Sequence, residues 1–162
     1  RKDKDFSEAE KAEYRAKING NRRKAKLLLW ASIMDLIRYY GIVFRWVELT
    51  GAEILCDRYI WDSYIDFSLK YRDIDFEKWL CWKIMLKLIK KPAKSFVFTI
   101  PIEESIRRSL EKKDPHSEPY DERLIRIQRY MTEIENGRWQ YVIDASFPVV
   151  EVTEKVKKIL ES

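Results

Sequence analysis

The residues best suited to chemistry form a charged pair directly after an apolar run. Asp57 and Arg58 follow residues 53–56, whose continuous apolarity is typical of a strand covered on both faces in a parallel sheet. The planar guanidinium of Arg58 matches the oxygens of a phosphate group. The Asp57 carboxylate would hold a metal-bound water or orient the arginine. An ordinary ion pair at the end of a strand is the alternative interpretation.

A second group of candidates is basic and precedes a loop with two prolines. Arg107 and Arg108, followed by Lys112 and Lys113, stand before residues 114–119. A basic segment that closes over a phosphoryl group would stabilise the negative charge that spreads during its transfer. A solvated helix face without a chemical role is the alternative.

Aromatic side chains supply a third candidate feature. Trp30 lies in a predicted helix, and Trp61 and Tyr64 follow the charged pair. An aromatic ring at the edge of a sheet can stack on a nucleotide base. Aromatic residues on an apolar stripe are also common in hydrophobic cores, so both interpretations stand.

The elements that must position these residues alternate between helices and short strands. Hydrophobic periodicity predicts helices over residues 24–49, 60–71, 75–89, 103–113, 120–136 and 149–160, and strands over 53–56, 95–100 and 140–143. Such alternation implies right-handed crossovers and an α/β fold with a three-layer parallel sheet. Because ligands bind beyond the carboxyl ends of such strands, we expect Asp57–Arg58, Pro101 and residues 144–146 on one functional edge.

The first predicted helix carries one apolar stripe at three-to-four spacing. Its members are Leu27, Trp30, Ala31, Met34 and Ile37. Gly41 is expected to bend or interrupt this helix, and Thr50-Gly51 to end it. Four charged residues interrupt positions 25–47, so we expect a buried or interfacial helix rather than a membrane span.

Composition indicates a globular chain with a basic tilt. Of 162 residues, 46% are apolar and 36% charged, and the net charge of +5 fits either a soluble domain or one whose partner bears phosphate. Acidic residues are mixed in everywhere except around residues 22–26, so we expect no nucleic-acid partner. Arg22-Arg23-Lys24 is the one weaker candidate for contact with a phosphate-rich polymer.

Few residues are available for disulfide or metal chemistry. Cys56 and Cys81 lie in apolar runs without a Cys-x-x-Cys spacing, so we expect reduced core thiols and a cytoplasmic protein. A single histidine, His116, excludes zinc sites built on several histidines. Residues 1–26 are highly charged, with Ser7 and Glu10 spaced as a capping box, and predict a solvated helical arm before a domain over 27–162.

Four segments, taken in order, resemble the thymidylate kinase family. They are residues 27–31 (LLLWA), 53–59 (EILCDRY), 100–107 (IPIEESIR) and 141–146 (YVIDAS). The resemblance runs through the chain after residue 25 and is closest to the thymidylate-kinase-like branch found with bacterial and archaeal sugar-polymer genes. It implies a P-loop nucleoside-monophosphate-kinase fold that transfers the γ-phosphoryl group of ATP, with Mg²⁺, to a nucleoside monophosphate.

The resemblance also implies roles for single residues. Arg58 would bind the acceptor phosphate, with Asp57 beside it near magnesium, and Trp30 would stack on the base. Arg107 would be the first arginine of a lid over residues 107–121, where Arg108, Lys112 or Lys113 share its work. Asp144, Ala145 and Ser146 would lie near the adenine end of the ATP site. The helix around residues 33–46 would form a homodimer.

Three positions depart from the family's pattern at the acceptor site. Met34 stands where an arginine reads thymine, Asp62 where a serine is common, and Phe67 where Gln or Thr is usual. The expected acceptor is therefore dTMP, another nucleotide or another phosphorylated molecule.

The largest departure concerns the P-loop. The four glycines of the chain form no Gly-x-x-x-x-Gly-Lys-Ser/Thr pattern. The resemblance places that loop after a first strand, upstream of the given sequence. We therefore expect roughly 50 to 70 preceding residues. A chain without this central strand is expected to fold poorly. The alternative hypothesis is a non-catalytic nucleotide-binding or assembly module. The kinase interpretation depends most on Arg58 standing at the rim of a buried strand over residues 53–56.

Overall fold

The computed structural model describes residues 21–112 and 119–162, so residues 1–20 of the predicted arm, its capping box and Lys113 lie outside the described residues. The predicted boundary of the arm at residue 26 is wrong, because residues 22–26 form the start of the first described helix and Ala25 is buried. The chain divides into two compact units. The helical unit comprises the residues up to Tyr59 together with Asp66–Lys91, and the sheet unit comprises Ile60–Ile65 with Pro92–Ser162. Across the described residues the structure is mostly helical with a small parallel sheet, an α/β mix in the broad sense.

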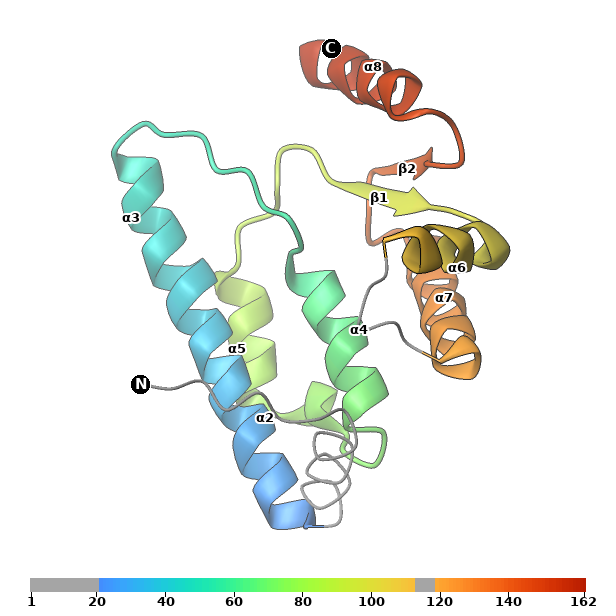
Figure 1. Cartoon of the computed structure of the whole chain (residues 1–162). Coiled ribbons are helices and arrows are strands. Elements are labelled where there is room, and N and C mark those ends of the chain that lie inside the picture. The colour runs from blue at the N-terminus through green and yellow to red at the C-terminus, as the bar shows by residue number, and fades with distance from the viewer. Residues whose placement is uncertain (1–20, 113–118) are drawn as a thin grey trace, which may run out of the picture. The chain divides into compact units, whose positions relative to one another are not determined.

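The helical unit is built on one continuous helical stretch, Arg22–Leu49 (Figure 1). It consists of α2 (Arg22–Leu36), the π-helical segment η1 (Ile37–Val43) and α3 (Phe44–Leu49). The Asn21 side chain caps its start by accepting a hydrogen bond from the Lys24 N–H at 3.2 Å. Gly51 follows its end with a φ of 76°. The predicted helix and its end are confirmed, and η1 contains Gly41, where an interruption was expected.

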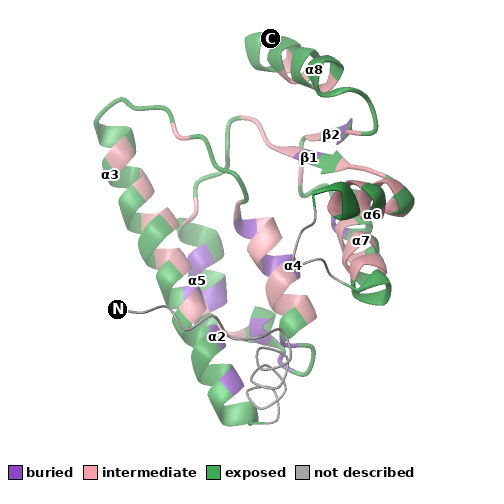
Figure 2. Cartoon of the chain, in the orientation of Figure 1, coloured by how far each residue is buried: buried purple, intermediate pink, exposed green. Residues whose placement is uncertain are grey.

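The buried face of α2 is not the predicted stripe. Ala25, Leu29 and Ile33, spaced by four residues, are the buried positions, and α2 packs against α5 (Leu80–Leu88; Figure 2). Of the predicted stripe, Leu27 is 65% exposed and Trp30 47% exposed. The helix therefore has two apolar faces, of which one is covered within the helical unit.

Within the described residues, Arg22–Leu49 is a helix whose length and composition would allow it to cross a membrane. The core helix of a soluble protein and a signal sequence share these two properties. They therefore do not identify a membrane protein, and the expectation of a non-membrane helix stays a prediction.

The predicted helix over residues 75–89 is divided in two. A short 3-10 turn, η2 (Phe76–Lys78), precedes α5, and Trp79 between them has extended backbone with ψ 141°. Phe76 and Trp82 meet edge to face with ring centroids 5.0 Å apart, and both are buried. The core of the helical unit forms around this pair and α2. The helix α4 (Ile60–Lys70) was predicted over residues 60–71 and is confirmed.

Residues 53–56 form no strand, and this prediction is wrong. They run as irregular backbone with Leu55 98% exposed, and the sheet of the described residues contains β1 and β2 alone. An apolar run becomes a strand only when a neighbouring strand satisfies its backbone groups. Cys56 is exposed with this segment and Cys81 is half-buried, so the expectation of core thiols is also wrong.

The sheet unit contains the two strands that were predicted in it. β1 (Phe96–Thr99) pairs in parallel with β2 (Tyr141–Asp144), in a register that runs from Phe96 opposite Tyr141 to Thr99 opposite Asp144. The chain passes from β1 to β2 through α6 (Ile102–Glu111) and α7 (Tyr120–Glu135), and α8 (Val149–Glu161) follows. The predicted order of strand, two helices, strand and helix is confirmed here.

The amino ends of the two strands are tied together by side chains. The backbone N–H of Ser95 donates to Gln140 Oε1, and the N–H of Gln140 donates to Ser95 Oγ, both at 3.0 Å. The rings of Phe96 and Tyr141 stack at 5.2 Å. These contacts fix the register of the pair, and with it the alignment of the carboxyl ends.

Candidate functional site

Arg58 adopts a left-handed backbone conformation with a φ of 80°. A non-glycine residue held in this region is strained by about 1–3 kcal/mol, and such strain is concentrated at functional sites. Its side chain is 67% exposed, and Nη1 lies 3.4 Å from Asp66 Oδ2. An ion pair this long and this exposed contributes little to stability. The turn therefore presents a cation to solvent rather than locking it into the fold.

Tyr59 anchors this turn to the helical unit. Its ring lies 4.7 Å from that of Tyr40 and stacks on Phe44 at 6.2 Å, and its hydroxyl donates to the Lys90 carbonyl oxygen at 2.8 Å. Burial, with smaller effects of Cys56, Tyr40 and Glu48, raises the pKa of Tyr59 to about 12. The hydroxyl thus stays protonated at neutral pH and can donate to Lys90, while the ring contacts Tyr40 of the π-helical segment.

Asp57 is exposed beside Arg58. In the described part of the chain, no three His, Cys, Asp or Glu side chains are grouped closely enough to hold a metal ion. Mg²⁺ in nucleotide sites commonly takes one or two protein carboxylates and completes its shell with phosphates and water. Asp57 alone would supply one carboxylate, so a role in holding Mg²⁺ would need phosphates and water as the other ligands and stays a prediction.

The predicted base-binding residues fall in two environments. Trp30 and Met34 lie one turn apart on α2 and are 47% and 39% exposed. Phe67 instead packs against Phe76 and Trp82, with centroids 5.9 and 6.4 Å away. The first two share an accessible face, whereas Phe67 belongs to the aromatic core of the helical unit.

Asp62 lies in the sheet unit and is engaged by α7. Its Oδ1 accepts a hydrogen bond from the Tyr130 hydroxyl at 2.7 Å. Next to it, the Arg138 guanidinium lies 4.0 Å from the centroid of the Trp61 ring, a cation–π contact. These contacts give Asp62 and Trp61 a structural role in joining α4 to α7.

The centre of this α4–α7 contact is a buried carboxylate that sequence reasoning missed. Glu133 is 2% exposed and accepts from Arg138 Nε at 3.2 Å, while Arg129 Nη2 lies 3.5 Å from its other oxygen. Arg129 also donates to the Tyr64 hydroxyl at 2.7 Å, and its buried Nε has no partner among the described residues. The available signal was an acid one turn after an arginine and next to Ile134.

The lid arginines are held by acids of their own helix. Arg107 pairs with Glu104 at 2.7 Å and with Glu111, and Arg108 Nε lies 2.6 Å from Glu104. Hydrogen bonds from Arg107 and Arg108 lower the pKa of Glu104 to about 2. Arg108 also donates to the Ala145 carbonyl oxygen at 3.0 Å, whereas Lys112 is exposed at the end of α6. Arg108 thus joins α6 to the loop after β2.

The carboxyl ends of β1 and β2 form one edge of the sheet unit. The N–H of Ala145 donates to the Thr99 carbonyl at 2.8 Å, and the N–H of Ser146 donates to Asp144 Oδ1 at 2.9 Å. Hydrogen bonds from Ser146 lower the pKa of Asp144. Pro101 follows β1 at this edge, as expected. Asp57 and Arg58 belong to the helical unit, so a single edge shared by all of them stays a prediction.

Comparison with known proteins adds no assignment. No family model, curated protein or solved structure matches the chain. We therefore infer the function of the chain from its residues, their geometry and the resemblance of the four segments.

Proposed function

We propose that the chain is the acceptor-binding part of a thymidylate-kinase-like phosphotransferase that moves the ATP γ-phosphoryl group to a nucleoside monophosphate. The observation that carries the proposal is the parallel register that sets Thr99 opposite Asp144. It supports a three-layer P-loop-type sheet as the finer fold, because both strands end at one edge and each is followed by a helix whose N-cap is a proline.

In this proposal, Arg58 binds the phosphate of the acceptor. Its left-handed backbone, exposed guanidinium and anchoring by Tyr59 support that role. No covalent intermediate is needed, because phosphoryl transfer is accelerated by positioning and charge stabilisation. Asp57 would hold Mg²⁺, which neutralises phosphate charge when it is bound with ATP. Arg107 would exchange its carboxylate partners for the phosphoryl group.

The proposal gives no strand role to residues 53–56, which lie outside the sheet of the described residues. An upstream segment with the P-loop would complete the ATP site. The acceptor site is carried by the turn at Asp57 and Arg58.

The test is an assay of the full-length protein with ATP, Mg²⁺ and a panel of nucleoside monophosphates, following ADP release. We expect Arg58→Ala to lower kcat/KM by about 100-fold or more, as loss of a charged transition-state contact does. Lys158→Gln on α8 is the control and leaves kcat/KM unchanged. Absence of turnover with every monophosphate, with a P-loop present in the protein, would refute the kinase.

The second candidate is a non-catalytic nucleotide-binding or assembly module. It is favoured by the position of residues 53–56 outside the sheet, which removes the strand rim on which the kinase interpretation most depended. It is also favoured by the pairing of Arg107 with carboxylates of α6. The upstream coding sequence distinguishes the two candidates: a Gly-rich loop ending in Lys-Ser/Thr supports the enzyme, and a start codon near Arg1 supports the module.

We also propose a homodimer formed through the exposed face of the long helix. Tyr39, Ile42 and Trp46, within residues 33–46, are large apolar side chains exposed there, and exposed apolar surface on a helix is a feature of interaction sites. Sedimentation velocity is expected to show a dimer that Trp46→Glu converts to a monomer. Leu160→Glu, on α8, is the control and leaves the dimer intact. A wild-type monomer at all concentrations would exclude this interface.

A further inference from the structure

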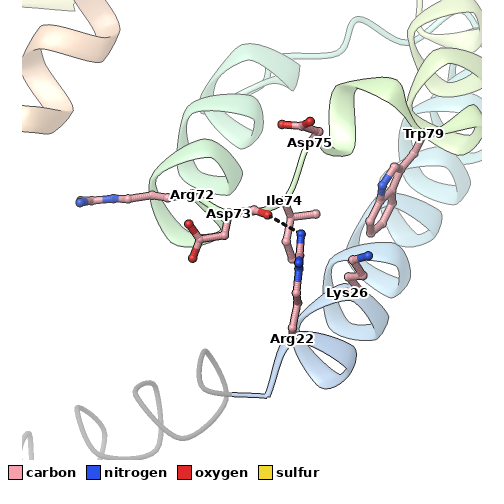
Figure 3. Close-up of a pocket in the computed structure, with 7 residues that line it drawn as sticks. All are labelled: Arg22, Lys26, Arg72, Asp73, Ile74, Asp75 and Trp79. Atoms are coloured by element: carbon pink, nitrogen blue, oxygen red, sulfur yellow. Dashed lines mark hydrogen bonds between the residues drawn. The ribbon is translucent and has the colours of Figure 1, made fainter.

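We infer that the helical unit contains a second phosphate site, separate from Arg58, that binds a nucleotide. The site is a cavity of about 330 Å³ between the first two turns of α2, residues 72–75 and Trp79 (Figure 3). That volume is within the range of small-molecule sites. The cavity also gives a role to the basic start of α2, which the proposed kinase does not use.

Two cations with little internal pairing line this cavity. Arg22 and Lys26 are one turn apart on α2, so their charges repel. Arg22 Nη2 makes a long hydrogen bond of 3.4 Å to the Asp73 carbonyl oxygen. Lys26 has neither a hydrogen bond nor an ion pair with the described residues. A phosphate dianion between them would relieve the repulsion and accept charge-assisted hydrogen bonds from both.

The acidic residues of the cavity wall neutralise this pair only in part: Lys78 has the largest effect in lowering the pKa of Asp75, and Arg22 has a smaller one. Asp75 Oδ2 lies 2.7 Å from Lys78 Nζ, which compensates its charge. Figure 3 shows Arg72 and the Asp73 carboxylate turned away from Arg22 and Lys26, while the Asp73 carbonyl points at Arg22. The part of the cavity next to α2 is therefore positive.

An aromatic ring beside the cations selects the class of ligand. Trp79 is half-buried and lines the cavity, and its extended backbone interrupts the predicted helix between η2 and α5. An indole next to two cations can stack on a base while the cations bind the attached phosphate. This combination fits a nucleotide better than free phosphate or an unphosphorylated nucleoside.

A site-specific experiment tests this inference. The full chain is labelled with 5-fluorotryptophan, the Trp79 resonance is assigned with Trp79→Leu, and AMP, inorganic phosphate and adenosine are titrated by fluorine NMR at low salt. We expect AMP to shift the Trp79 resonance saturably, and Arg22→Gln with Lys26→Gln to weaken that response about tenfold or more, as lost charged hydrogen bonds do. Phosphate and adenosine should bind more weakly than AMP.

The matched control removes the same charge at the same spacing. Lys83 and Lys87 are exposed and one turn apart on α5, and neither lines the cavity. The control, Lys83→Gln with Lys87→Gln, should keep the AMP midpoint within about twofold, as expected for surface charges distant from a ligand. Arg58→Gln should also leave the Trp79 response unchanged, which separates this site from the proposed acceptor site.

Three results would overturn the inference. They are the absence of a saturable Trp79 shift with AMP, an equal loss in the α5 control, and an RNA oligomer that shifts Trp79 at far lower concentration than AMP with a steep salt dependence. The last result would mean that the basic start of α2 binds a nucleic-acid polymer rather than a single nucleotide. Unchanged fluorine resonances of the other tryptophans would show that each variant is folded.

Discussion

A set of arginines in the sheet unit is paired within the fold, whereas two arginines of the helical unit are paired only weakly. In the sheet unit, Arg129 and Arg138 surround the buried Glu133, and Arg108 is shared between Glu104 and the Ala145 carbonyl. In the helical unit, Arg22 and Arg58 make single contacts of 3.4 Å. Cations paired inside the fold join elements together, whereas weakly paired ones remain available to an external anion. This difference separates structural arginines from candidate ligand-binding ones.

The largest expected effect is at the buried carboxylate of the sheet unit. Glu133→Ala should lower the free energy of unfolding by about 2–3 kcal/mol, because it removes the charged hydrogen-bond partner of Arg138 and Arg129, whose partial exposure lets water compensate some of the loss. Urea unfolding measures this loss. The control is Glu154→Gln, which removes an exposed ion pair with Lys157 and should cost under about 0.5 kcal/mol. Equal effects of the two changes would mean that Glu133 contributes no more than an exposed ion pair, and that the arginines around it are not held more firmly than surface ones.

Tyr59 offers the corresponding change in the helical unit. Tyr59→Ala should cost about 2 kcal/mol, below the roughly 3–5 kcal/mol of a fully buried aromatic because this ring is half-buried. Tyr59→Phe should cost about 1 kcal/mol for the hydroxyl bond to Lys90. Urea unfolding again supplies the measurement. Tyr39→Phe serves as the control, because its ring contacts are kept. A Tyr59→Phe protein as stable as wild type would exclude an anchoring hydroxyl.

The same tyrosine predicts a pH dependence. Its folded pKa of about 12 exceeds the unfolded value of about 10. Its contribution is therefore fully present below pH 10 and is lost as the pH rises from about 10 through 12. The difference in unfolding free energy between wild type and Tyr59→Phe should shrink over this interval. A constant difference would mean that the hydroxyl titrates normally.

Two substitutions at Arg58 test whether its backbone conformation is strained. Arg58→Gly should be more stable than Arg58→Ala by about 1 kcal/mol, because only glycine accepts a φ of 80° without a steric cost. Both variants lose the guanidinium, so thermal unfolding of the pair isolates the backbone term. If the two are equally stable, the turn is relaxed in solution.

The smallest expected effects compare a glycine from each unit. A Cβ at Gly41 would meet Leu88 Cβ at 3.7 Å, an ordinary contact, so Gly41→Ala should stabilise the protein by about 0.5 kcal/mol. Gly137 has a φ of 70°, so Gly137→Ala should destabilise it by about 1 kcal/mol. Thermal unfolding of both variants checks the opposite signs. Destabilisation by Gly41→Ala would show that the π-helical segment requires glycine.

Local patterns predicted most elements but not their packing. The helices and the two strands of the sheet unit follow from periodicity and from end signals such as Pro101 and Gly137. Residues 53–56 were mispredicted because an apolar run forms a strand only beside another strand, and the run itself does not show whether that neighbour is present. The stripe through Leu27 and Trp30 was misleading because α2 has two apolar faces, and periodicity does not identify the covered one.

The candidate site was only partly predictable for a related reason. The exposed turn at Arg58 follows from its sequence, but the anchoring of Tyr59 by Tyr40 and Lys90 joins residues far apart in the chain. The network of Glu133 likewise needs Tyr64 through Arg129. Long-range partners of this kind leave no periodic signal, so Asp62 was assigned to a ligand site although Tyr130 binds it.

The π-helical segment Ile37–Val43 has a consequence for how this chain can vary in length. Its turns are wider than those of an α-helix, because its hydrogen bonds span five residues: the N–H of Phe44 donates to the Tyr39 carbonyl. Removing one residue there would restore four-residue bonding while α2 and α3 keep their own contacts. Related chains are therefore expected to gain or lose residues within 37–43, and to keep a constant length on either side.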